Sequence, residues 1–492
     1  MRQINLTLPQ KAGPTYLRIA DAIRTAIQRG QLIPGEKLPS CRNLAQDLEV
    51  HRHTVMASLN ELKAQGWLDS RERRGYVVST ELPDKYFSSR EYSAEQKGRF
   101  VRLRFARKPS FRSIKNRDPE ISFNFSTGRP DVRLFPIAEF RACVADSLRK
   151  PNESLMSYGE PSGTPRLRSA LSNYLRKARS IVGREIFVSN GSVEGIYMLS
   201  HLFLKPGDTA GIEAIGFPPA IEAIRSTGAT IKPIRVDDTG LDPDDLERKL
   251  QQTNIRLLYL TPLHQYPMTT TLAIEKRERI YSLARKYRFA IIEDDYDHEY
   301  HYASQPLAPM AANDPAGLVM YVSSFSKVMF PAIRVGFLAI PEYVSNALGD
   351  LRKTINRQNN TIIQEAVGRW IEQGGLERHL RKTRKIYQHR RNVLCDAIDD
   401  LRDGGLVMDY RRPEGGMTIW LNTHSDSTEL TRIAAARGVR LTPDAISYTN
   451  PRVESTHVRL GFAAHNADEL RSGALLLGEF LSGAPGSVMR NR

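Results

Sequence analysis

The most informative segment of the sequence is SSFSKVMFPAIRVGF, residues 323–337. It follows LVMYV at 318–322, an apolar run whose length and composition are typical of a buried strand. Lys327 stands just beyond this run, with Ser324 three residues before it and Arg334 seven residues after it. A buried strand that ends in hydroxyl and cationic side chains indicates a binding site at the edge of a sheet.

The same pattern recurs along the chain from Ile121 onward. Short β-rich runs alternate with helical stretches, which predicts an α/β domain with a mostly parallel sheet covered by helices on both faces. The carboxyl ends of such strands are where ligands bind, and each run here ends in polar residues. These ends are Gly191-Ser192, Glu213, His264-Gln265 and Asp294-Asp295-Tyr296.

The residue types at these ends suit pyridoxal 5′-phosphate (PLP). Its aldehyde needs a lysine amine for a Schiff base, which Lys327 supplies, and its pyridine nitrogen needs a carboxylate, which Asp294 supplies at the end of a buried strand. Phe217 could cover the ring. The phosphate needs a helix N-terminus with hydroxyl and guanidinium donors, and the candidates are Gly191, Ser192, Ser324 and Arg334.

From about residue 121 to 480 the chain resembles class I aminotransferases of fold type I. Its segments SYGEPSGTPRLRSAL, VSNGSVEGI, LTPLHQYP, IIEDDYDHEY and SSFSKVMFPAIRVGF look most like the aminotransferase-like part of MocR regulators. The resemblance implies that Lys327 forms the internal aldimine, that Asp294 pairs with the pyridine nitrogen and that Tyr296 hydrogen-bonds the phenolic oxygen. It implies the phosphate contacts expected above, a further one from Tyr158 of a second subunit, Phe217 stacked on the ring, and Arg459 on the carboxylate of an amino-acid ligand.

Two positions depart from that family. Val193 stands where the family has a glutamine that reaches the phosphate, so one anchor is absent. The segment 266–269, Tyr-Pro-Met-Thr, lacks the glycine that usually follows two residues after the proline. Neither departure removes the lysine, the carboxylate or the arginine.

The first eighty residues predict a DNA-binding unit. Apolar periodicity indicates one helix from Tyr16 to about Gly30, a second that Ser40 caps, and a third over 52–65, followed by a hairpin up to Val78. This stretch resembles the winged helix-turn-helix of the GntR family. The resemblance points to Arg42, Arg52, Thr54 and Gly75 as DNA-contacting residues.

Further residues of this unit complete the prediction. Arginines at the hairpin tip suit a wing that grips phosphate or the minor groove, namely Arg71, Arg73 and Arg74. His51 stands where the GntR family has a small hydroxyl residue, so the helix cap of that position cannot be carried over. The predicted core consists of Val55, Leu59, Leu62 and Trp67.

The sequence predicts a winged helix-turn-helix over 1–80, a basic linker over 81–118 and an aminotransferase-like domain over 119–492. The net charge of +16 favours a polyanionic partner or an anionic ligand. Three cysteines without a repeated spacing support neither a disulfide framework nor a zinc site, and we expect no metal. No apolar leader or membrane span is visible, so we expect a cytoplasmic protein.

Two functions remain open from the sequence. In the first, the protein is a transcription regulator that binds PLP and senses PLP, an amine or an amino acid. In the second, it is a working aminotransferase with an accessory DNA-binding unit. The DNA-binding unit and the basic linker are superfluous to a metabolic enzyme, which favours the regulator. Aminotransferase-like domains of this type resemble dimers whose sites are completed across the interface, and paired operators match two-fold symmetry. We therefore expect a homodimer.

Overall fold

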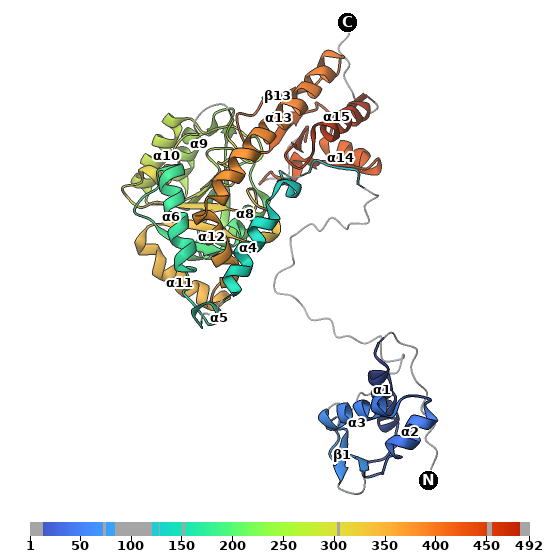
Figure 1. Cartoon of the computed structure of the whole chain (residues 1–492). Helices are drawn as coiled ribbons and strands as arrows, with labels where there is room; N and C mark the ends of the chain where they lie inside the picture. The colour runs from blue at the N-terminus through green and yellow to red at the C-terminus, as the bar shows by residue number, and fades with distance from the viewer. Residues whose placement is uncertain are drawn as a thin grey trace. The chain divides into compact units, whose positions relative to one another are not determined.

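The computed structural model describes residues 13–71, 75–83, 121–126, 128–149, 153–302, 306–449 and 455–482. The chain divides into two compact units, residues 1–113 and 114–492, and each is described by itself (Figure 1). Most of the predicted linker, residues 84–118, lies outside the described residues, as do Arg73, Arg74 and the side chain of Arg71 at the predicted wing tip.

The N-terminal unit is three helices followed by a hairpin, as predicted. Its elements are α1 (Thr15–Gln28), α2 (Cys41–Asp47), α3 (Arg52–Ala64), β1 (Leu68–Arg71) and β2 (Gly75–Val78), with β1 and β2 antiparallel. Ser40 caps α2 by accepting the backbone N–H of Asn43 at 3.2 Å, whereas His51 gives α3 no side-chain cap. The predicted core residues Val55, Leu59, Leu62 and Trp67 are all buried.

The second unit is built on a seven-stranded sheet with the order β4-β12-β11-β10-β9-β5-β6. All pairs are parallel except those of β12, which runs antiparallel to β4 and to β11. This confirms the predicted mostly parallel sheet. The strands are β4 (Glu185–Ser189), β5 (Thr209–Glu213), β6 (Thr230–Ile234), β9 (Ile255–Leu260), β10 (Ala290–Asp294), β11 (Val319–Ser324) and β12 (Gly336–Ile340).

Both faces of this sheet are buried because the first residues of its central strands β10 and β11 are apolar on both sides, before each strand ends in polar residues. Along β10, Ile291 points into one hydrophobic core and Ile292 into the other, as the two-residue period of a strand requires. The first core includes residues of α6 (Pro165–Arg179), α9 (Pro243–Gln252), α10 (Ile274–Tyr287) and α12 (Thr361–Glu372). The second includes residues of α7 (Ser192–Phe203), α8 (Pro218–Arg225) and α11 (Glu342–Ile355).

A smaller antiparallel sheet has the order β13-β14-β17-β16. Its strands are β13 (Asp409–Tyr410), β14 (Thr418–Asn422), β16 (Thr442–Pro443) and β17 (His457–Gly461), and its helices are α14 (Ser427–Ala436) and α15 (Ala467–Ser482). The long helix α13 (Gly375–Asp403) contacts both α12 and α15 and so joins this layer to the large sheet (Figure 1).

The start of the second unit packs against both layers. The short strand β3 (Phe123–Asn124) pairs in parallel with β15 (Val439–Arg440), and α4 (Ile137–Leu148) packs on α12. The remaining short elements are α5 (Glu153–Met156), β7 (Val236–Asp237) and β8 (Gly240–Leu241). Within the described part of the chain, no helix combines the length and the apolar character needed to span a membrane.

Candidate functional site

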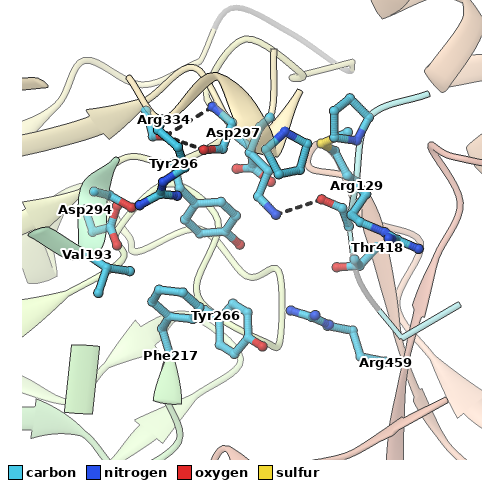
Figure 2. Close-up of a pocket in the computed structure, with 18 residues that line it drawn as sticks. Arg129, Val193, Phe217, Tyr266, Asp294, Tyr296, Asp297, Arg334, Thr418 and Arg459 are labelled. Carbon is cyan, nitrogen blue, oxygen red and sulfur yellow. Dashed lines mark hydrogen bonds between the residues drawn. The ribbon is translucent and has the colours of Figure 1, made fainter. Parts of the chain in front are cut away.

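A cavity of about 230 Å³ lies where β10 and β11 end, facing the smaller sheet (Figure 2). Eight of the residues predicted for the cofactor site line it: Ser192, Phe217, Asp294, Tyr296, Ser324, Lys327, Arg334 and Arg459. Asp294 and Ser324 are the last residues of their strands, while Arg459 comes from β17. The cavity is therefore formed by both layers of the unit.

Lys327 lies three residues beyond β11, and its Nζ donates a hydrogen bond to the backbone oxygen of Gly128 at 2.7 Å. Enclosure lowers the pKa of Lys327 to about 8, and the nearby Arg459 acts in the same direction, against the carboxylates Asp297 and Asp294. An amine with this pKa is uncharged in part of the molecules near neutral pH, as a nucleophile requires.

Asp294 offers an unsatisfied oxygen to the cavity. Its Oδ2 accepts the hydroxyl of Tyr259 at 2.8 Å, whereas its Oδ1 is buried without a hydrogen-bond partner among the described residues. Burial raises the pKa of Asp294 to about 7, and Asp295 and Asp297 add to the shift against the hydrogen bond from Tyr259. A buried acceptor without a donor costs free energy, so this atom is ready for a ligand N–H.

The residues predicted to hold phosphate lie around the start of α7 and the end of β11. Gly191 precedes the helix with a φ of 84° and is not among the lining residues, whereas Ser192, the first residue of the helix, lines the cavity. Ser324 Oγ donates to Ser326 Oγ at 2.9 Å, and Arg334 donates to the backbone oxygen of Asn190. Val193 also lines the cavity and brings no donor, as expected.

Arg459 lies on an aromatic wall. Its guanidinium is 4.7 Å from the centroid of the Tyr266 ring, and Phe217 packs edge-on to Tyr266 with ring centroids 5.2 Å apart (Figure 2). Its Nη2 donates to the backbone oxygen of Ser126 at 2.9 Å, but its Nε is buried without a partner among the described residues. This unsatisfied N–H can bind an anionic group.

The residues present therefore fit PLP. Asp294 Oδ1 and Arg459 Nε are buried polar atoms without a partner in the described part of the chain, and a pyridine N–H and a ligand carboxylate are the groups that would satisfy them. Among the described residues no group of three or more His, Cys, Asp or Glu side chains could hold a metal ion.

Sequence reasoning missed several residues that line the cavity, and those with polar or charged side chains include Arg129, Tyr266 and Asp297. Tyr266 and Asp297 lie inside segments that had been singled out, at the ends of β9 and β10, and their polar side chains were a usable signal. Arg129 lies before the first long strand, and nothing in its neighbourhood indicates that it reaches the site.

The loop over 266–269 keeps a glycine-like backbone without a glycine. Thr269 has a φ of 62°, in the left-handed region that glycine favours, and its N–H donates to the backbone oxygen of Gln265 at 2.7 Å. The departure from the family pattern therefore leaves Tyr266 in the cavity wall.

Tyr158 is not part of the cavity formed by its own chain. Its side chain is 74% exposed, with the Arg357 guanidinium 4.6 Å from the ring centroid. The predicted role of Tyr158 requires a second subunit and stays a prediction.

The residues predicted to contact DNA lie on the surface of the N-terminal unit. Arg42 is the second residue of α2, Arg52 the first of α3, and both are exposed without a hydrogen-bond or ion-pair partner among the described residues. Thr54 is half-buried on the first turn of α3, and Gly75 begins β2 with a φ of 82° and open space around it. Their contacts with DNA stay predictions.

Comparison with known proteins identifies the class of the chain. Residues 121–474 match the family described as aminotransferase class I and II, and residues 15–78 match the gntR family of bacterial regulatory proteins. The chain belongs to the aminotransferase class I and II family and carries a GntR unit in front of it, the organisation of MocR-type regulators. The cofactor of this class is PLP.

Three particular proteins illustrate the similarity. The probable rhizopine catabolism regulatory protein MocR of Rhizobium meliloti is 27% identical over 94% of this chain and 92% of its own length. The pyridoxine biosynthesis transcriptional regulator PdxR of Corynebacterium glutamicum is 28% identical over 93% of each chain. The structure of Pyrococcus horikoshii kynurenine aminotransferase, solved with PMP, has a TM-score of 0.69 and 27% identity, and covers 74% of this chain and 91% of its own.

Gly191→Ala is expected to weaken PLP binding about tenfold, which is about 1.4 kcal/mol. A Cβ on Gly191 would lie 3.0 to 3.2 Å from the guanidinium of Arg334 and would push that side chain away from the other residues predicted to hold phosphate. The dissociation constant is measured by titrating the apoprotein with PLP. Gly207→Ala is the control, because Gly207 has a φ of +92° and nothing within 4 Å of its Cβ position, so it shares only the backbone strain. Equal affinities of the two variants would contradict the assignment.

Proposed function

We propose that the protein is a transcription regulator that binds an operator in double-stranded DNA, attaches PLP covalently at Lys327 and responds to an amino acid or small amine. The observation that carries this proposal is that one chain holds both a GntR unit and a cavity with a reactive lysine. In the GntR unit, Arg42 and Arg52 are exposed and have no partner among the described residues. In the cavity, Asp294 Oδ1 and Arg459 Nε lack partners among the residues that the structure describes. A metabolic enzyme has no use for the first of these units.

Each residue of the cavity has one task in this proposal. When bound, the cofactor supplies an aldehyde carbon that reacts with amines and a ring that withdraws electrons. Lys327 Nζ would hold the cofactor covalently, Asp294 would accept a hydrogen bond from the protonated ring nitrogen through Oδ1, and Tyr296 would donate to the phenolic oxygen. Arg459 orients the effector through its carboxylate. The phosphate is held by Gly191, Ser192, Ser324 and Arg334.

In this proposal the dimer exists in two states that differ in their affinity for DNA. The effector can shift the balance between them only by as much as its own affinities for the two states differ. We infer a homodimer, since exposed Tyr158 is available to a second subunit's phosphate site and a dimer matches two operator half-sites. As a DNA-binding protein it acts in the cytoplasm.

The test measures operator affinity of the PLP-loaded protein, with an operator selected from random duplexes. L-amino acids and small aliphatic amines are added one at a time. We expect at least one to change both the visible absorbance and the operator Kd of the wild type, and none to do so in Lys327→Ala. Sustained conversion of an amino donor with a keto-acid acceptor, at unchanged operator affinity, would instead establish an aminotransferase.

A further inference from the structure

Three buried side chains form a row that leads away from the cofactor cavity. Asp297 lines the cavity beside Lys327 and Tyr296, and its Oδ1 lies 2.6 Å from Nδ1 of His264. Nε2 of His264 lies 3.3 Å from Nδ1 of His301, and the two imidazole rings are nearly parallel, with an interplanar angle of 11°. All three side chains are buried.

The row ends at a second cavity. His301 lines a space of about 390 Å³ between α6 and α13, which shares no lining residue with the cofactor cavity. Lys177 and Arg381 are exposed at this second cavity, and His298 and Glu299 contribute to its buried side. Asp297 and His301 therefore connect two separate spaces through one intervening imidazole.

The backbone beside the row is shaped to fit it. A Cβ on Gly415 would lie 2.2 Å from Nε2 of His264, and a Cβ on Gly416 would lie 3.2 Å from Oδ2 of Asp297. Gly415 also forms a β-bridge with His301. Any side chain at Gly415 would displace His264, so the close packing of the row depends on this glycine.

The hydrogen-bond chemistry sets the direction of the row. An ionised Asp297 can only accept, so His264 donates from Nδ1 and its Nε2 is left to accept from Nδ1–H of His301. In the other protonation state every bond reverses, with a proton on Oδ1 of Asp297 and on Nε2 of each histidine. The two states differ by one proton, which enters or leaves at His301.

We propose that Asp297, His264 and His301 are a proton relay between the amine at the cofactor cavity and the second cavity. Asp297 exchanges the proton with the amine, and the two histidines are positioning residues that act through it. Outward, Asp297 Oδ1 passes its proton to His264 Nδ1, His264 passes the Nε2 proton to His301 Nδ1, and His301 releases its Nε2 proton to water. Each shift breaks one O–H or N–H bond and forms another, so no co-reactant is needed.

Different charged groups surround the two ends of the row. Burial lowers the pKa of His301, and the groups that act on it include His264, Glu414, Arg179 and Arg384. At the other end the amine of Lys327 faces Arg459, Asp294 and Arg129 as well as Asp297. A neutral His301 is the form that can accept a proton from the second cavity. The relay thus lets the amine gain or lose a proton by way of the second cavity.

The inference rests on the proposed function only in assigning the Lys327 amine as the group that exchanges a proton with Asp297. The first measurement therefore uses the protein without cofactor. The short His264–Asp297 hydrogen bond should give a proton NMR signal far downfield in the full-length apoprotein. This signal should persist in Lys327→Ala and vanish in Asp297→Asn. Its exchange with solvent should slow at least about tenfold in His301→Gln and in His301→Asn, because the route to the second cavity is interrupted. His298→Gln is the matched control, since His298 lines the same cavity outside the row.

The second measurement uses the PLP-loaded protein. The pH midpoint of its visible absorbance should shift by about one unit or more in His301→Gln and should be unchanged in His298→Gln. Unaltered exchange and an unaltered pH midpoint in folded His301 variants would overturn the relay. Absence of any lysine-bound cofactor in the wild type would overturn the proposed function and leave the NMR result as an independent test of the row.

Discussion

Lys327→Ala is expected to abolish covalent attachment of PLP completely. No other lysine lines the cavity described here, and the pKa of about 8 makes Lys327 the amine that reacts near neutral pH. Wild-type protein that is loaded with PLP and reduced with borohydride should carry the adduct on the peptide containing residue 327. The variant should carry none, and its visible absorbance should match that of free PLP.

Lys353→Ala is the control for this experiment. Lys353 lies on α11 with a side chain that is 62% exposed and paired with Asp350, so its removal leaves the cavity intact. It should retain the adduct and the absorbance of the wild type. Binding to DNA of random sequence should be unchanged in both variants, because the GntR unit is not altered. An adduct on another residue in Lys327→Ala would refute the assignment.

Arg52→Ala is expected to weaken operator binding by about 1–3 kcal/mol, or about 5- to 150-fold in Kd. Arg52 begins α3, its side chain is exposed, and no acidic partner among the described residues competes for it. The first turn of a recognition helix is the part that reaches base edges in the major groove. Titration of the selected operator and of a scrambled duplex, at one salt concentration, measures both the loss and the specificity.

Lys63→Ala removes the same charge from the last turn of α3 and is the matched control. Lys63 lies at the opposite end of the helix from Arg52, and its Nζ donates a hydrogen bond to Ser70 Oγ at 3.0 Å. Its removal should cost the operator and the scrambled duplex about equally. If Arg52→Ala also weakens both duplexes equally, Arg52 contacts phosphate and does not read a base.

Local patterns in the sequence predicted most of the elements. The strands β10 and β11 were recognisable because each begins with consecutive apolar residues, as in a strand buried on both faces, and ends in polar residues. The cap of α2 was recognisable because the Ser40 hydroxyl accepts an N–H only three residues away. Such signals depend only on residues close together in the chain, so they can be recognised without knowledge of the fold.

Signals that depend on distant partners were missed. Arg129 reaches the cavity only because β3 pairs with β15, which brings the start of the second unit beside β17. Asp297 was visible as one acidic residue among several, but its pairing with His264 depends on β9 and β10 lying side by side. The antiparallel pairing of β12 with β4 likewise joins segments far apart in the chain.

By itself, the sequence determined the two kinds of unit, the strands and helices of each, and the residues able to hold PLP, because periodicity, capping and side-chain chemistry act over a few residues. Only the tertiary structure decided which of these residues share one cavity, which of their polar atoms lack a partner, and that a row of imidazoles leads from Asp297 to a second space. These properties depend on distances between residues far apart in the chain, which only the packing of the two sheets sets.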